Sequence, residues 1–173
     1  AEELFILQAR PETVQAAKEV SALKSYHLKE KGEVLVQGTA IGDAIISAPV
    51  CRLESPSESE KFIDGAILVT EVTHPDWVVI MKRASGIITE QGGRTSHAAI
   101  VSRELGVPAI VGAQGATTRL KNKEVVTLSC AEGDQGVVYK GALDFEVEEL
   151  DLSTLKETRT DIMVNIASPG ASF

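Results

Sequence analysis

Short apolar runs, separated by glycines and polar turns, make up most of the central part of the chain and are typical of buried strands. They predict strands over residues 34–37, 44–47, 49–53, 66–70, 86–89, 109–111, 124–129 and 136–139. Helical spacing instead predicts helices over residues 76–84 and 96–105. Gly106 and Pro108 would end the second helix. The alternation of strands and helices indicates one compact domain of mixed α/β class over about residues 33–145.

The two ends of the chain follow different patterns. Residues 4–10 predict a short strand, and residues 12–24 predict a helix that begins directly after a proline. The charged residues 29–33 predict a linker, and the acidic stretch 146–157 predicts a second one. A strand-like run lies close to each end of the chain, over residues 4–10 and 162–166. We therefore expect this sequence to be a piece of a longer polypeptide.

Composition narrows the classes of function. Hydrophobic residues make up 43% of the 173 residues and charged residues 24%, an ordinary balance for a globular domain. A net charge of −8 argues against nucleic acid as a partner, because a phosphate backbone would be repelled. No apolar run approaches the roughly 18 residues that span a membrane, and no signal peptide is visible. Cys51 and Cys130 stand far apart, which favours two buried free thiols over a structural zinc site.

Residues 86–97 contain the clearest candidate chemistry. A predicted strand leads through Gly92-Gly93 into the first turn of a predicted helix. Backbone N–H groups at a helix start have no helical partner, and together with the helix dipole they favour an anion. Arg94 adds a cation, and Thr95 and Ser96 are both acceptable caps whose hydroxyls could also bind phosphate. The pattern therefore predicts a phosphate site at this turn.

His97 would project from the first turn of this helix, at the edge of an apolar arc that includes Ala98, Ile100, Val101 and Leu105. A neutral imidazole is a good nucleophile near pH 7, and a phosphorus–nitrogen bond is labile enough to pass its phosphoryl group on. The alternative is a structural or capping histidine, and the residues by themselves leave the two equally open. A nucleotide-binding loop and a serine nucleophile at Ser96 lack their usual surrounding motifs.

The wider motif adds a resemblance. Residues 93–103 closely resemble the phosphohistidine motif of enzymes that make or use phosphoenolpyruvate. Residues 73–77, 104–112 and 130–134 resemble the phosphoenolpyruvate synthase branch of that family, whose dikinase relatives usually differ after the second arginine. Ser96 departs from that branch, which often has Cys beside the histidine.

The flanks carry a second part of the resemblance. Residues 7–13 resemble the end of the family's ATP-grasp domain, where the residues that match Gln8 and Arg10 help to hold ATP and its metal. Residues 161–173 resemble the beginning of the family's pyruvate-binding (β/α)₈ barrel. The resemblance thus implies three parts: the end of an ATP-grasp domain and a linker over 1–28, a phosphohistidine domain over 29–145, and a linker with the start of the barrel over 146–173.

The family resemblance implies a swivelling β/β/α phosphohistidine domain with short stubs of its neighbours, and the activity of a pyruvate, water dikinase. The histidine that matches His97 would take a pyrophosphoryl group from Mg²⁺-bound ATP, lose phosphate to water and pass the remaining phosphoryl group to pyruvate. Nε2 would be the nitrogen that reacts. The residues expected around the phosphate are Gly93, Arg94, Thr95, Ser96 and Arg103. Arg103 would more easily meet another domain's ligand or a carboxylate than the phosphate on His97.

Further expectations concern partners and regulation. In the family, the threonine at the position of Thr95 is a regulatory phosphorylation site, so a kinase and phosphorylase would act there. ATP, Mg²⁺ and pyruvate would bind mainly outside the central domain, no metal would bind within it, and this chain by itself would be inactive in the full reaction. A cytoplasmic enzyme that forms a homodimer is also implied. Three alternatives stay open: pyruvate, phosphate dikinase, the sugar-transport Enzyme I, and a non-catalytic anion-binding module. Gln8 and Arg10 favour the ATP-using enzymes over Enzyme I.

Overall fold

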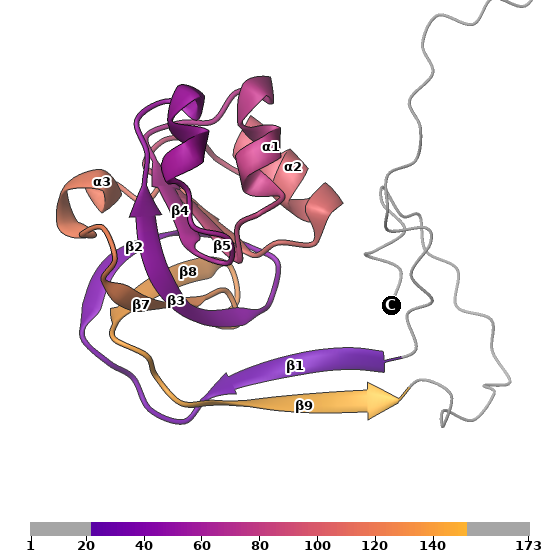
Figure 1. Ribbon diagram of the computed structural model, residues 1–173. Coiled ribbons are helices and arrows are strands. Elements are labelled where there is room, and N and C mark those ends of the chain that lie inside the picture. The colour runs from indigo at the N-terminus through magenta and orange to yellow at the C-terminus, as the bar shows by residue number, and fades with distance from the viewer. Residues whose placement is uncertain (1–21, 152–173) are drawn as a thin grey trace, which may run out of the picture.

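The structure is a computed structural model that describes residues 22–151, and its main body is a closed barrel of seven strands (Figure 1). The order around the barrel is β2-β6-β5-β4-β3-β7-β8. The strands are β2 Val34–Ile41, β3 Ile45–Arg52, β4 Ile67–Thr70, β5 Gly86–Thr89, β6 Ala109–Val111, β7 Val125–Ser129 and β8 Gln135–Lys140. Strands β3, β4, β5 and β6 run parallel, and the remaining pairings are antiparallel.

Strands β4, β5 and β6 are buried on both faces, which explains their continuous apolar runs. Successive side chains of a strand point to opposite faces. Ile67 and Ile88 accordingly belong to the cluster inside the barrel, whereas Leu68 and Ile87 belong to the cluster under the helices. The α/β class expected from the sequence is confirmed by this arrangement.

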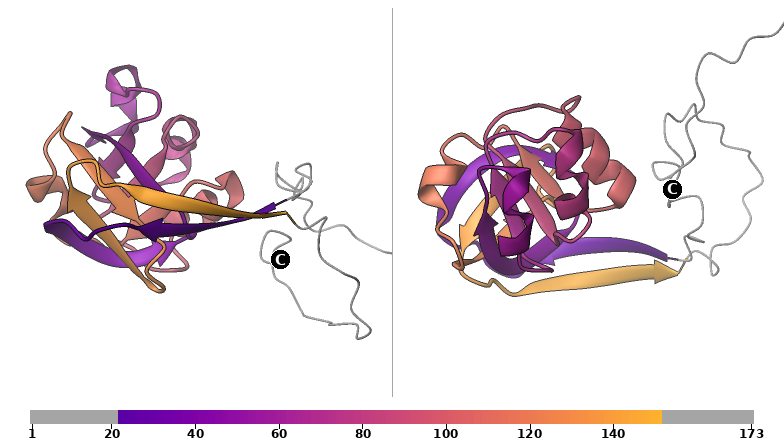
Figure 2. Two further views of the ribbon diagram at one scale, coloured as in Figure 1. Left: turned by 90° about the horizontal axis from the view of Figure 1, so that it is seen from below. Right: turned by 45° about the horizontal axis from the view of Figure 1, so that its top comes forward.

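The helical segments are short, and several of them gather over one side of the barrel (Figures 1 and 2). They are the 3₁₀ turns η2 Pro56–Lys61 and η3 Pro75–Trp77 and the α-helices α1 Val78–Met81, α2 His97–Leu105 and α3 Ala116–Arg119. Helix α2 confirms the helix predicted over 96–105, and it ends at Gly106 in the left-handed conformation. The helix predicted over 76–84 is shorter, because a 3₁₀ turn precedes a single α-helical turn. Helix α3 was not predicted.

The strand predicted over residues 34–37 is longer in the structure, where β2 runs from Val34 to Ile41. The strand continues through Gly38, which faces Gly136 of β8 in the antiparallel register. A Cβ at Gly38 would lie 2.6 Å from the carbonyl oxygen of Val111. The glycine therefore permits close approach of strands within the barrel. In the sequence, a glycine with this role cannot be distinguished from one that ends a strand at a turn. Strand β3 is likewise one strand, where two were predicted over 44–47 and 49–53.

A separate antiparallel ribbon of two strands projects from the barrel (Figures 1 and 2). Its strands are β1 Ala22–Leu28 and β9 Phe145–Asp151. The helix predicted over 12–24 is therefore wrong where it overlaps β1, and the first part of the linker predicted over 146–157 forms strand β9. The acidic residues instead pair across the ribbon, with Lys24 3.7 Å from Glu149 and Lys29 3.0 Å from Glu146. The rest of both segments, and the strands predicted over 4–10 and 162–166, lie outside the described residues.

Both cysteines are free and buried, which confirms the prediction of two buried thiols. Burial raises the pKa of the Cys130 thiol to about 11, so this side chain stays protonated at neutral pH. No helix within residues 22–151 is long and apolar enough to cross a membrane.

Candidate functional site around His97

The parallel strands bring the candidate site together. Strands β4 and β5 are neighbours in parallel register, so the loops that follow them leave the barrel at the same rim. Thr73 lies in the loop after β4, and His97 begins the helix reached by the loop after β5. The hydroxyl oxygen of Thr73 lies 3.0 Å from His97 Nδ1. Residues 24 positions apart in the chain thus meet through a hydrogen bond.

The turn before His97 is fixed by its own backbone. Gly92 has a φ of +110°, and a Cβ there would lie 2.8 Å from Ser96 Oγ, so this position requires glycine. The backbone N–H of Ser96 donates to the Gly93 carbonyl over 2.9 Å. Ser96 Oγ accepts from the Ala99 N–H at 3.4 Å and caps α2. Of the two expected caps, Ser96 fills the position, and Thr95 beside it is exposed.

His97 is partly buried at the edge of the covered face of α2. Ala98, Ala99 and Ser102 form that buried face, whereas Ile100 is 47% exposed. The expectation that Ile100 shares the buried arc is wrong, because two residues turn a helix by about 200° and place it opposite Ala98. His97 therefore stands where the helix meets solvent, with one side of its ring packed.

The surroundings of His97 keep its imidazole neutral. Burial is the main cause that lowers the pKa of His97 below its usual 6.5, and the nearby His74 lowers it further. The carboxylates of Asp76 and Glu104 act in the opposite direction and are outweighed. At neutral pH the ring is therefore the unprotonated form that a nucleophile requires.

The contact with Thr73 distinguishes the two ring nitrogens. Nδ1 is engaged by the Thr73 hydroxyl, so Nε2 is the nitrogen available for bond formation. The distance fits either tautomer. The tautomer in which Nδ1–H donates to Thr73 leaves a lone pair on Nε2, which a nucleophilic imidazole would need.

The two arginines expected near a phosphate hold different partners. The guanidinium of Arg94 forms an ion pair with Asp134, with Nη2 and Oδ1 2.6 Å apart. Arg103 donates to the carbonyl oxygens of Arg94, at 2.9 Å, and of Ala99, at 3.5 Å. Arg103 thus links the loop that carries Arg94 to helix α2.

Sequence reasoning overlooked four residues of this site. Thr73, His74 and Asp76 belong to the run that resembles phosphoenolpyruvate synthase over 73–77, and Asp134 belongs to the similar run over 130–134. The resemblance singled out both runs, but the spacing of residues along the chain could not predict that either run lies near His97. Gln8 and Arg10, the expected nucleotide-binding residues, lie outside the described residues.

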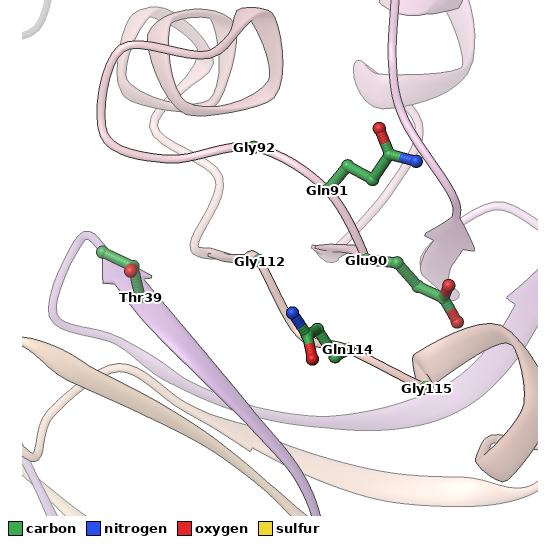
Figure 3. A pocket seen from close by; sticks show the side chains of 7 residues that line it. All are labelled: Thr39, Glu90, Gln91, Gly92, Gly112, Gln114 and Gly115. Carbon is green, nitrogen blue, oxygen red and sulfur yellow. The ribbon is translucent and has the colours of Figure 1, made fainter.

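A shallow pocket of about 560 Å³ lies next to the turn, at the carboxyl ends of β5 and β6 (Figure 3). It is lined by Thr39, Glu90, Gln91, Gly92, Gly112, Gln114 and Gly115. Figure 3 shows Glu90 extending toward the helix after Gly115, where its carboxylate accepts from the Thr117 N–H at 2.7 Å and hydroxyl at 2.6 Å. The pocket shares Gly92 with the turn, but His97 does not line it. Among residues 22–151, no group of three or more His, Cys, Asp or Glu side chains could hold a metal ion.

Comparison with known proteins places this geometry in context. Residues 62–133 match the model of the mobile domain of PEP-utilising enzymes, a segment that includes both Thr73 and His97. The chain is 48% identical to phosphoenolpyruvate synthase from Aquifex aeolicus (strain VF5), over 99% of this chain and 21% of that protein. The corresponding protein of Escherichia coli (strain K12) is 46% identical, over 98% of this chain and 21% of its own length.

A third relative is the phosphoenolpyruvate synthase of Deinococcus radiodurans, which is 49% identical over 99% of this chain and 22% of that protein. The chain therefore spans about a fifth of the length of the curated relatives it matches. Among solved structures, an NMR structure of Enzyme I is 33% identical with a TM-score of 0.37, covering 43% of this chain and 31% of that one.

Proposed function

Because the chain belongs to the family of phosphoenolpyruvate-utilising enzymes, we propose that it is the phosphocarrier part of a phosphoenolpyruvate synthase, with His97 as the phosphorylated residue. The observation that carries this proposal is the hydrogen bond between Thr73 and His97 Nδ1. It orients a neutral imidazole and leaves Nε2 to react. A merely structural histidine would not need one nitrogen held and the other left available.

The proposed reaction has three steps. First, the Nε2 lone pair attacks the β-phosphorus of ATP, the bond from this phosphorus to the α-phosphate oxygen breaks, and AMP leaves. Water then attacks the terminal phosphorus of the pyrophosphohistidine and releases inorganic phosphate. Finally, the oxygen of the pyruvate enolate, formed by loss of a methyl proton, attacks the remaining phosphorus. The phosphorus–nitrogen bond breaks, and its electron pair returns to Nε2.

Residues of this chain prepare the histidine for these steps. In the tautomer protonated at Nδ1, the Thr73 hydroxyl oxygen accepts a hydrogen bond from Nδ1–H, and the Nε2 lone pair is left to attack. Burial keeps the ring unprotonated. The Ser96 cap and the glycine turn fix the start of α2 and with it the direction of the imidazole.

The substrates would be held elsewhere in the full-length protein. Gln8 and Arg10 would belong to the ATP site of a nucleotide domain, and residues 146–173 would lead into a pyruvate-binding barrel. Mg²⁺ would accompany ATP in that nucleotide domain. The 173-residue chain would therefore lack the full activity, and AMP formation from ATP and pyruvate by this chain would contradict the assigned boundaries. We place the enzyme in the cytoplasm and expect a homodimer of the full-length protein.

Thr95 is the proposed site of regulation. Its side chain is exposed two residues before His97, and Ser96 supplies the helix cap in its place. A modifying enzyme could therefore reach Thr95 without undoing α2. A phosphate on Thr95 would add about two negative charges beside the nucleophile and repel the incoming ATP phosphates.

The direct test uses ATP labelled with ³²P at the β-phosphate and the full-length protein that contains this chain. We expect label on the protein that is lost in acid and kept in alkali, and that disappears in His97→Ala. His27→Ala, which changes an exposed histidine of the ribbon, serves as the matched control and should be labelled normally. Label that persists in His97→Ala would overturn the proposal, and a complete absence of label would favour the anion-binding module. Release of pyrophosphate in place of phosphate would identify a pyruvate, phosphate dikinase.

A further inference from the structure

The ion pair between Arg94 and Asp134 connects the turn before His97 with the turn between β7 and β8. The β7–β8 turn is itself well anchored. The Asp134 carbonyl accepts from the Ala40 N–H at 3.0 Å, and Glu132 accepts from the Tyr139 hydroxyl at 2.7 Å and pairs with Lys31 at 3.1 Å. The Asp134 carboxylate is thus presented to Arg94 by a fixed piece of the barrel.

The charged groups around His97 include two carboxylates, which would repel a phosphoryl group on this residue. The charged or titratable groups that act on the imidazole are His74, Asp76 and Glu104. A phosphoryl group on Nε2 would bring about two further negative charges next to two carboxylates. A neighbouring cation would therefore stabilise the phosphorylated state.

Arg94 is the cation that can move to a phosphoryl group on His97. Arg103 is committed to the carbonyl oxygens of Arg94 and Ala99, and moving it would loosen the loop. The Arg94 side chain is 53% exposed and that of Asp134 is 93% exposed. An ion pair so open to water is weak, so a doubly charged phosphoryl group three residues along the chain can compete for the guanidinium.

We propose that Asp134 is a positioning residue, which holds the Arg94 guanidinium beside the loop while His97 is free and yields it to the phosphoryl group once His97 carries one. This inference rests on the proposed phosphocarrier function and adds a residue to it. Asp134 acts through Arg94, and it sets how strongly the phosphorylated state is favoured. Without Asp134, the Arg94 guanidinium does not have to break an ion pair before it binds the phosphoryl group. The phosphorylated state therefore becomes more stable relative to the free state.

The equilibrium of the first half-reaction tests the proposal. The full-length protein is incubated with Mg²⁺, β-labelled ATP and fixed concentrations of AMP and phosphate, without pyruvate, and the ratio of labelled to free protein is measured. Asp134→Asn should raise this ratio about two- to fivefold, the range that an exposed charge pair supports. Arg94→Gln should lower it by a similar factor. The double variant should match Arg94→Gln alone, and Asp43→Asn, an exposed aspartate in the turn between β2 and β3, should leave the ratio unchanged.

A second readout follows Arg94 directly in the 173-residue chain. Phosphoramidate, a small phosphoryl donor, would phosphorylate His97: its phosphorus–nitrogen bond breaks, ammonia leaves and a bond to Nε2 forms. The NMR signal of the Arg94 Nε–H group should shift on phosphorylation, and it should not shift in His97→Ala. In Asp134→Asn the signal of the free chain should differ from that of the wild type, whereas the phosphorylated signals should coincide.

The outcomes separate this inference from the function on which it rests. If the wild-type protein takes no label from ATP, the phosphocarrier function itself is wrong. If it is labelled but Asp134→Asn leaves the ratio unchanged or lowers it, only the role of Asp134 is wrong. An Asp134→Asn effect that survives in the absence of Arg94 would equally overturn it, because the carboxylate would then act on the phosphoryl group without the arginine.

Discussion

The interior of the barrel and the rim around His97, where the loops after β4 and β5 leave the barrel, are stabilised by different kinds of contact. Inside, side chains such as Ile88 and Ile110 are fully buried and fixed by packing on every side. At the rim, polar side chains are joined by a hydrogen bond or an exposed ion pair, as Thr73–His97 and Arg94–Asp134 are. The interior therefore sets where the backbone of the rim lies, and the rim side chains can change partners while the fold stays intact.

The largest expected effect comes from the interior. Ile110→Ala should lower the free energy of unfolding by about 2–5 kcal/mol, because it leaves a cavity among fully buried neighbours. Denaturant unfolding followed by circular dichroism measures this change. Val125→Ala, which truncates a side chain that is 43% exposed, should change stability by less than about 0.5 kcal/mol. Similar losses for both variants would contradict the contrast between interior and surface.

The rim should show the opposite behaviour, with altered chemistry and little change in stability. Thr73→Val keeps the shape of the side chain but removes the partner of His97 Nδ1. We expect the rate of labelling by ATP to fall about two- to tenfold, as the loss of one hydrogen bond implies. Nitrogen NMR of the imidazole should show more of the tautomer protonated at Nε2. Thr118→Val, at an exposed threonine of α3, is the control, and an equal loss of rate there would contradict an orienting role of Thr73.

The pH dependence of labelling by ATP tests whether charged groups at the rim act on His97. The lowered pKa of His97 predicts that the acidic limb of the labelling rate has its midpoint below the usual value of 6.5. Asp76→Asn removes a carboxylate that raises this pKa and should move the limb to lower pH, whereas His74→Gln should move it to higher pH. A limb that both variants move in the same direction would show that these groups do not act through charge.

The lowered pKa of His97 also makes the stability of the folded chain depend on pH. The unfolded chain takes up a proton on His97 at a higher pH than the folded chain does, so the unfolded state binds more protons in the window between the two pKa values. Stability therefore rises with pH from the folded pKa up to about 6.5 and is lost as the pH falls through this window. Urea unfolding of wild type and His97→Gln across this range would reveal the difference.

The smallest expected effect lies in α2, where interior and rim meet. Ser102 is fully buried, and within the described residues its hydroxyl has no hydrogen-bond partner. Ser102→Ala should therefore leave stability unchanged or raise it by up to about 1 kcal/mol, with labelling unaffected. A clear loss of stability, measured by thermal unfolding against Ser57→Ala at an exposed position, would mean that this hydroxyl has a partner after all.

Much of the fold could be predicted because local pattern and burial agree there. The apolar runs of β4, β5 and β6 are too short for helices and are bounded by turn residues, and each became a buried strand. The ribbon was missed because its stability depends on pairing between segments more than a hundred residues apart, such as Lys24 with Glu149. Neither acidic nor basic residues in one strand of such a pair indicate where the other strand lies.

The sequence by itself determined the turn and the helix start that carry His97, the proposed reactive residue. The glycines before His97, the serine cap and the helix that begins at the histidine all follow from local backbone chemistry, because each depends on residues within a few positions. Only the tertiary structure decided what surrounds the imidazole. The parallel pairing of β4 and β5 brings Thr73 to Nδ1, and the turn after β7 brings Asp134 to Arg94. Such contacts join distant segments through the barrel, and their geometry exists only once the core has closed.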